Sequence, residues 1–281
     1  ALMSVISRAL ATPNRFNIII KLLSNSNQNA MVKDELLLLI SPPILTSNTP
    51  NEKPSATAID SLSEARVLGI VTQEAGPSEI ITLAEPFRGT APLSLLSYLE
   101  PILVGTRTDG NTSQRDMPKM LEWLLVQDPR TPINLSSNLS SQTDGILNSA
   151  ANAQQFAYWA RFLGYAWHFQ GAGGWWLVPD PTEALSRHLP RLIGGEEEVL
   201  LSSLPARWAA DCPVLEGGPN RPFDAGNPQF SQATSLALLR LGQKGTITLD
   251  KKSDGHTSLL SVGDHAEAFS HVSLTQPTAA S

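Results

Sequence analysis

The sequence predicts a mainly helical α+β chain with short β-hairpins, built from tandem winged helix-turn-helix modules. Two observations lead to this fold class. Apolar residues recur at the spacing of amphipathic helices in successive segments, and each group of helices is followed by two short strand-like runs that flank glycine. This helices-then-hairpin order occurs three times without a fixed sequence period. We therefore expect three modules, over residues 1–90, 91–180 and 181–281.

The first module contains three expected helices and one hairpin. The Thr12-Pro13 pair suits the N-cap and first turn of a helix that ends in the polar run 24–29. A second helix is expected over 32–40 and a third over 55–68. β-branched residues on both sides of a Gly-Pro pair then predict a hairpin over 70–83.

The same order is expected in the other two modules. In the second module, helices are expected over 117–126 and 150–163, followed by a hairpin over 165–178. The third module is expected to have helices over 182–192, 196–210 and 230–241 and strands over 246–249 and 269–274.

Several details of the third module depend on single residues. The glutamates at 196–198 suit the start of a helix, because the helix dipole favours carboxylates there. Gly242 is a natural stop for the last helix. Residues 251–267 are expected to be a flexible connection, and the turn-rich stretch 212–228 receives no assignment.

Composition excludes several classes of protein. Only 16% of the residues are charged, and the longest apolar runs are far too short to span a bilayer. A single cysteine, Cys212, excludes a disulfide framework and a cysteine-rich zinc site. No basic segment followed by an apolar one opens the chain. We therefore expect a cytoplasmic protein that does not enter membranes.

The charge distribution argues against a basic nucleic-acid-binding arm. The net charge is −6, from 20 basic and 26 acidic residues, and no third of the chain is basic. Binding to nucleic acid without sequence preference needs a patch of Lys and Arg side chains that displace counterions from phosphates. Composition alone indicates no such patch.

The segment 55–68 holds the position of a recognition helix, and we expect six of its side chains to point outward. They are Ser55, Thr57, Asp60, Ser61, Glu64 and Arg66. A DNA-reading helix usually presents several Arg, Lys, Asn or Gln side chains. Here carboxylates accompany one arginine, so a protein-binding module is favoured over a DNA reader. If DNA is contacted, the candidate residues are Arg15, Lys53, Ser55, Thr57, Arg66 and Arg88.

Aromatic residues are concentrated between 156 and 176. Stacking of nucleobases on such side chains is an established mode of binding, but core packing is the favoured interpretation. Strand alternation is expected to place Tyr165, Trp167 and Phe169 on the same, core-facing side of the sheet. Trp175 and Trp176 are the candidates for a partner-binding hot spot if they are exposed on the wing.

Motifs for catalysis or cofactor binding are not found in the sequence. The chain has five histidines, but their spacing matches no helix-borne ligand motif, and no nucleophile elbow, phosphate-binding loop or HExxH motif occurs. We expect no metal, no cofactor and no enzymatic activity.

Five short phrases, in order, resemble one known family. They are PNR at residues 13–15, LLVQDP at 124–129, ARFLG at 160–164, LVPDPTEAL at 177–185 and SLALLRL at 235–241. In this order the chain resembles the DpdG proteins, which are encoded in bacterial clusters that place 7-deazaguanine bases in DNA and restrict unmodified DNA. The resemblance implies a setting in phage defence beside helicases, an ATPase and a nuclease. It implies no catalytic residue.

These observations favour a non-catalytic adaptor subunit of a bacterial DNA-modification and antiviral defence system. The expected partners are protein subunits of the same system; binding of double-stranded DNA and formation of a homodimer are left open. One alternative is a winged-helix DNA-binding regulator, which requires Arg15, Lys53, Arg66 and Arg88 to converge on one face. Another is a subunit that resembles the kleisin-binding proteins of chromosome-organising ATPase complexes.

Overall fold

The computed structural model describes residues 4–7, 11–42, 55–74, 76, 78–107, 114–224, 226–252 and 256–275. The chain divides into two compact units, each with buried apolar residues. Unit 1 comprises Ala1–Leu103, Arg107–Met117 and Leu139–Trp159, and unit 2 comprises Val104–Thr106, Pro118–Asn138 and Ala160–Ser281. Helices and small antiparallel sheets confirm the α+β class. The division into three modules at residues 90 and 180 stays a prediction.

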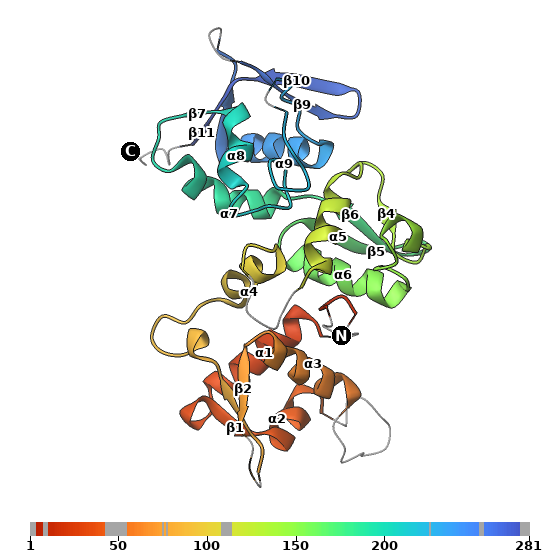
Figure 1. Ribbon diagram of the computed structural model, residues 1–281, viewed down its shortest axis with the longest axis vertical. Helices are drawn as coiled ribbons and strands as arrows, with labels where there is room; N and C mark the ends of the chain where they lie inside the picture. Colours follow the sequence, from red (N-terminus) through yellow and green to blue (C-terminus); the bar gives the residue numbers. More distant parts are fainter. Residues whose placement is uncertain are drawn as a thin grey trace. The chain divides into compact units, whose positions relative to one another are not determined.

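Unit 1 begins with three helices and a three-stranded sheet, red and orange in Figure 1. The elements are α1 (Pro13–Ser24), η1 (Asn27–Asn29), β1 (Ala30–Val32), α2 (Lys33–Ile40), α3 (Ala56–Val67), β2 (Val71–Glu74) and β3 (Ile80–Leu83). The sheet order is β1-β3-β2, with both pairs antiparallel. The three helices and the β2–β3 hairpin agree with the prediction, whereas β1 had no recognisable signal in its three residues.

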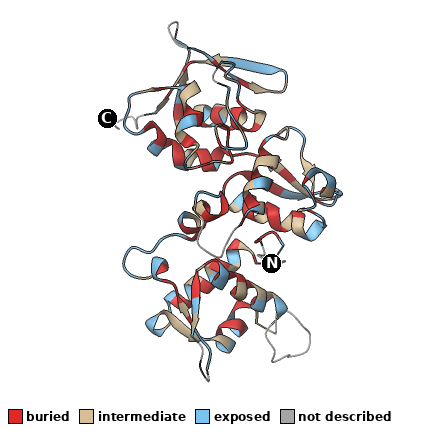
Figure 2. Cartoon of the chain, viewed as in Figure 1, coloured by how far each residue is buried: buried red, intermediate tan, exposed pale blue. Residues whose placement is uncertain are grey.

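The core of this part of unit 1 lies between the helices and the sheet. The three helices contact one another and the strands, and their buried residues are red in Figure 2. Phe16 and Ile19 of α1 are fully buried. The Phe16 ring packs at a tilt on Trp159 of α6 (Ala150–Phe162), with ring centroids 5.5 Å apart. Ser55 caps α3 because its hydroxyl accepts a hydrogen bond from the Ala58 N–H at 3.2 Å.

The middle of the chain supplies a second three-stranded sheet. Its elements are η3 (Glu85–Phe87), α4 (Leu95–Leu103), α5 (Asp116–Leu125), β4 (Ile133–Asn134), η4 (Ser140–Gln142), α6, β5 (Ala166–Gly171) and β6 (Gly174–Pro179). The sheet order is β4-β6-β5. Helices α5 and α6 and the β5–β6 hairpin lie close to their expected positions. Helix α4, which contains Pro101, and strand β4 were not predicted.

The last part of unit 2 contains a third sheet and an additional hairpin. Its elements are α7 (Thr182–Ile193), β7 (Val199–Leu200), η5 (Leu201–Ser203), α8 (Leu204–Trp208), α9 (Gln232–Gln243), β8 (Ile247–Asp250), β9 (Ser258–Val262), β10 (His265–Phe269) and β11 (His271–Leu274). The sheet order is β7-β11-β8, and β9 pairs with β10. Figure 2 shows β10 as largely exposed.

The three sheets share one connectivity. In each sheet the strand that comes last in the chain lies in the centre, between the first strand and the middle one. In the third sheet the β9–β10 hairpin is inserted before the central strand. A helix precedes the first strand of each sheet, and helical turns separate the first strand from the second. The predicted order, helices followed by a hairpin, therefore omitted one element of each repeat, the first edge strand.

The expectation of one helix over residues 196–210 is wrong. Residues 199–200 form β7 because they pair with β11, and only Leu204–Trp208 is α-helical. The glutamates do not begin a helix. Instead, Glu196 pairs with Arg207, and this hydrogen bond lowers the pKa of the Glu196 carboxyl group; Glu198 pairs with Lys252.

Two further expectations for the third module are wrong. Residues 251–267, expected to be a flexible connection, contain β9 and the start of β10, although 253–255 lie outside the described residues. Gly242 does not end the last helix, since α9 continues to Gln243. The residue with left-handed backbone is Gly245, at φ +69°.

A buried ionic network orders the turn-rich stretch 212–228. The Glu216 carboxylate accepts hydrogen bonds from Arg221 Nη2 at 2.9 Å, the Ser231 N–H at 2.9 Å and Thr234 Oγ1 at 2.8 Å. Ser231 is the N-cap of α9. The network therefore joins this stretch to the start of α9, which no local sequence pattern indicates.

Candidate functional site

A groove of about 270 Å³ lies in unit 1 beside α3. Residues of α2, α3 and the β2–β3 hairpin line it. They are Lys33, Leu37, Ile59, Leu62, Ser63, Arg66, Val71, Gln73, Glu79 and Ile81. Leu37, Leu62, Val71 and Ile81 are almost fully buried. The floor of the groove is thus the outer edge of the core that the helices and sheet share.

The polar side chains of the groove form a continuous hydrogen-bonded chain. Arg66 Nη1 donates to Gln73 Oε1 at 2.9 Å, and Gln73 Nε2 donates to Glu79 Oε1 at 2.8 Å. The Lys33 ammonium pairs with the other oxygen of Glu79. Both cations therefore have partners within the groove.

The exposed side of α3 is more apolar than the sequence predicts. Ile59 and Val67 are 47% and 38% exposed, whereas Ser61 and Glu64, expected to point outward, are fully buried. The reason is geometric. Both α1 and α2 pack against α3, so its buried arc is wider than the apolar face formed by residues such as Ala58.

The chain matches the model of a known protein family. The family model described as DpdG-like matches residues 3–255. The chain belongs to the DpdG-like family. Membership confirms the resemblance found in the sequence and suggests a role in a DNA modification system. No curated protein and no solved structure gives a significant match to the chain.

Within this DpdG-like chain, three of the candidate DNA-contact residues lie on or next to α3. Arg66 is exposed at the groove and bound to Gln73. Ser55 is half-buried, and its hydroxyl is occupied as the N-cap. Thr57 is half-buried, and its carbonyl oxygen accepts a hydrogen bond from Ser61 Oγ at 2.8 Å. Of the three, Arg66 is the exposed one.

The other candidate DNA-contact residues lie elsewhere. Arg15 is half-buried in α1, where burial lowers the pKa of its guanidinium while Tyr158 acts in the opposite direction. Arg88 follows β3 and donates through Nε to the Leu83 carbonyl oxygen, with Glu85 3.7 Å from Nη1. Lys53 lies outside the described residues. Contact of this set with DNA stays a prediction.

The aromatic residues of the β5–β6 hairpin are arranged differently from the expected core-facing row. Trp167 and Phe169 are 53% and 46% exposed, while Tyr165 is fully buried. Tyr165 precedes β5, and within the strand the buried side belongs to Ala166 and His168. The expectation that all three rings face the core is therefore wrong for two of them. No signal in the sequence distinguishes the two faces, because both carry apolar residues.

The two candidate hot-spot residues lie on opposite faces of this hairpin. Trp176 is paired with Phe169, so it shares the outer face of Trp167 and Phe169. Trp175 is on the other face, where its ring lies 5.4 Å from that of His168. Both tryptophans are half-buried, and Trp176 Nε1 donates to the Ala172 carbonyl oxygen at 3.2 Å. Their role in partner binding stays a prediction.

In the described part of the chain, no group of three or more His, Cys, Asp or Glu side chains is arranged to hold a metal ion. Cys212 is buried. Over the same residues, no helix has the length and apolar character required to cross a bilayer.

Proposed function

We propose that the chain is a non-catalytic adaptor subunit of a bacterial DNA-modification and phage-defence system, built from tandem winged-helix modules that bind partner proteins. One observation carries the proposal. The exposed side of α3 presents Ile59 and Val67, and its arginine, Arg66, is bound to Gln73 within the same unit. A surface of this kind suits a protein partner, because the centres of protein interfaces are apolar and poor in unpaired charge.

The shared connectivity of the three sheets supports the winged-helix assignment. A winged helix combines a helix-turn-helix with a small three-stranded antiparallel sheet. In that sheet the last strand along the chain lies in the centre, between the first strand and the second. The order β1-β3-β2, with α2 and α3 between β1 and β2, has this arrangement. The orders β4-β6-β5 and β7-β11-β8 repeat it. A partner protein could therefore dock on several similar modules.

Co-purification tests the adaptor function. The tagged chain is co-expressed with the proteins encoded beside it, and the recovered proteins are quantified. We expect wild type to retain a partner and Ile59→Asp to reduce its recovery about tenfold or more, since a charge would be buried in the interface. Val126→Asp is the matched control, because Val126 is an exposed apolar residue of unit 2, at 59%. Thermal unfolding of each variant verifies that it folds.

The outcomes separate the adaptor from the regulator. Equal recovery with wild type and Ile59→Asp would remove α3 from the interface. Failure to retain any partner, combined with salt-sensitive duplex binding that Arg66→Gln weakens, would favour the DNA-binding regulator instead. Light scattering at two protein concentrations determines whether a homodimer forms.

A further inference from the structure

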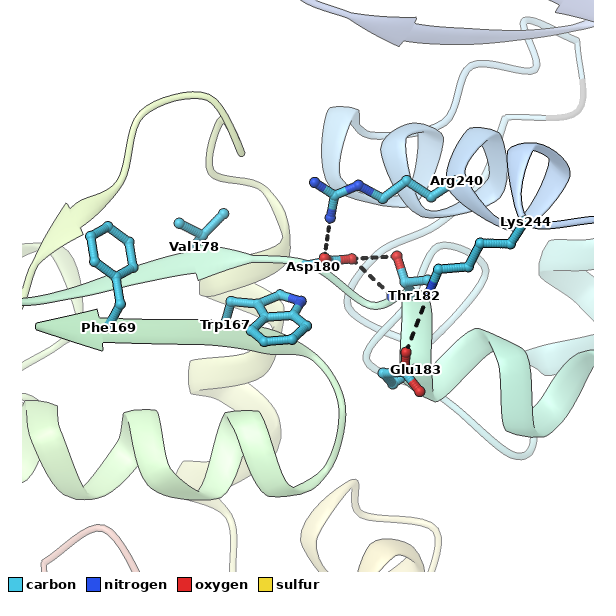
Figure 3. A pocket seen from close by; sticks show the side chains of 8 residues that line it. All are labelled: Trp167, Phe169, Val178, Asp180, Thr182, Glu183, Arg240 and Lys244. Atoms are coloured by element: carbon cyan, nitrogen blue, oxygen red, sulfur yellow. Dashed lines mark hydrogen bonds and ion pairs between the residues drawn. The ribbon is translucent and has the colours of Figure 1, made fainter.

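A second hollow, of about 480 Å³, lies in unit 2 between the outer face of the β5–β6 hairpin and the helices α7 and α9. Figure 3 shows its lining. The residues are Trp167, Phe169, Val178, Asp180, Thr182, Glu183, Arg240 and Lys244. They combine exposed aromatic rings on the hairpin with long cationic side chains, from Arg240 in α9 and from Lys244 at its C-cap. This combination distinguishes the hollow from the groove beside α3.

The aromatic side of the hollow is an open platform. Trp167 and Phe169 are two residues apart on β5, so their side chains share one face and their Cα atoms are about 7 Å apart. Val178 is paired with Trp167 across the hairpin and extends the same face. Rings this exposed, at 53% and 46%, are not needed to close the core.

A buried carboxylate fixes one of the cations at the rim. Asp180 is fully buried; it accepts hydrogen bonds from the Thr182 N–H at 3.1 Å and from the Thr182 hydroxyl, and pairs with Arg240. The Arg240 side chain nevertheless remains 44% exposed. Lys244 is 59% exposed and lies 3.6 Å from Glu183, a long and solvated contact.

One further arginine adds positive charge next to the rings. The guanidinium of Arg161 lies over the Trp167 ring, 5.9 Å from its centroid. Together with Arg240 and Lys244, Arg161 makes three cations against the two carboxylates that line the hollow, Asp180 and Glu183. The local charge is thus positive in a chain whose net charge is −6.

We propose that this hollow binds single-stranded DNA, with neighbouring bases stacked on Trp167 and Phe169 and the phosphates along Arg161, Arg240 and Lys244. Exposed rings flanked by cations are the combination that single-stranded nucleic acid requires. A duplex does not satisfy it, because its bases are already paired and stacked. The choice of DNA over RNA rests on the proposed function in a DNA-modification system. The stacking geometry itself is independent of that function.

Fluorescence anisotropy of the full chain with a labelled oligothymidylate of about 12 nucleotides tests the proposal. The salt concentration is about 50 mM, where electrostatic binding is strong. We expect Trp167→Ala to weaken binding about tenfold and Trp167→Phe to retain most of the affinity, because phenylalanine keeps a ring for stacking. Lys244→Gln should cause a smaller loss of affinity and a shallower salt dependence. Val126→Ala and Lys252→Gln are matched controls, because both residues are exposed in unit 2 and do not line the hollow. The matched duplex is expected to bind at least tenfold more weakly.

Each other outcome overturns the proposal. These are no binding by wild type, equal binding by wild type and Trp167→Ala, or tighter binding of oligouridylate of the same length. Loss of a co-purifying protein in Trp167→Ala would also overturn it, by making the rings a protein contact. If Trp167→Ala weakens DNA binding while partner recovery is unchanged, the proposal stands whatever the fate of the adaptor surface on α3.

Discussion

At the scale of single residues, neighbouring positions in one strand have opposite environments. In β5, Trp167 is half-exposed while the adjacent His168 is buried against Trp175. Burial lowers the pKa of His168 below its ordinary value of 6.5, and the positive charge of Arg161 lowers it further. His168 is therefore neutral at physiological pH in the folded chain.

This shift predicts how stability depends on pH. Since the pKa of His168 is lower in the folded chain than in the unfolded one, its contribution is fully present above pH 6.5 and is lost as the pH falls below that value. We expect the thermal midpoint of wild type to fall between about pH 7 and about pH 5 by more than that of His168→Gln. His265→Gln, at an exposed position, should fall as wild type does. Parallel pH profiles for wild type and His168→Gln would contradict the assignment.

At the scale of elements, Gly218 and Gly242 differ in the space that surrounds them. Gly218 lies in a tight turn, where an added Cβ would approach the Pro213 carbonyl oxygen to 1.7 Å. Gly242 lies inside α9, where an added Cβ would be 3.7 Å from the nearest atom, in Leu249. The first position requires glycine for space, and the second does not.

Alanine substitutions at the two positions should therefore change stability in opposite directions. We expect Gly218→Ala to lower the free energy of unfolding by at least about 2 kcal/mol, because the backbone must move to relieve the clash. Gly242→Ala should raise it by up to about 1 kcal/mol, because alanine is favoured in a helix interior. Urea denaturation measures both values. A stable Gly218→Ala variant would contradict the turn geometry.

At the scale of the whole molecule, charge limits the partners. The chain carries 26 acidic and 20 basic residues, and many of the basic side chains pair with carboxylates, as Lys33 does with Glu79 and Arg207 with Glu196. Long-range attraction to a polyanion is therefore weak, and any nucleic-acid contact depends on a local site.

This charge balance makes a prediction for duplex DNA. At about 150 mM salt we expect a random duplex to bind more weakly than about 10 µM, with a shallow dependence on salt, since few phosphate contacts can form. A salt series measured by anisotropy provides both numbers. Tight binding with a steep slope would revive the regulator hypothesis, and Arg66→Gln would then show whether α3 reads the DNA.

Local sequence patterns predicted the positions of those helices and hairpins that depend on residues close together in the chain. Helices α1, α2, α3, α6 and α7 and the hairpins β2–β3 and β5–β6 lie within a residue or two of their expected positions. Apolar spacing and glycine punctuation act over a few residues, so they are visible in one sequence. The resemblance to the DpdG proteins was likewise carried by short phrases.

Only the tertiary structure decided which surfaces are exposed and which distant residues meet. Strands β1, β4 and β7 are too short to have a pattern of their own, and pairing with a later strand defines them. Burial of Ser61 and exposure of Ile59 depend on the helices packed against α3. At the rim of the hollow, Asp180 pairs with Arg240, which lies 60 residues later in the chain. The sequence by itself thus determined the local elements and the family, whereas long-range packing determined the faces on which function depends.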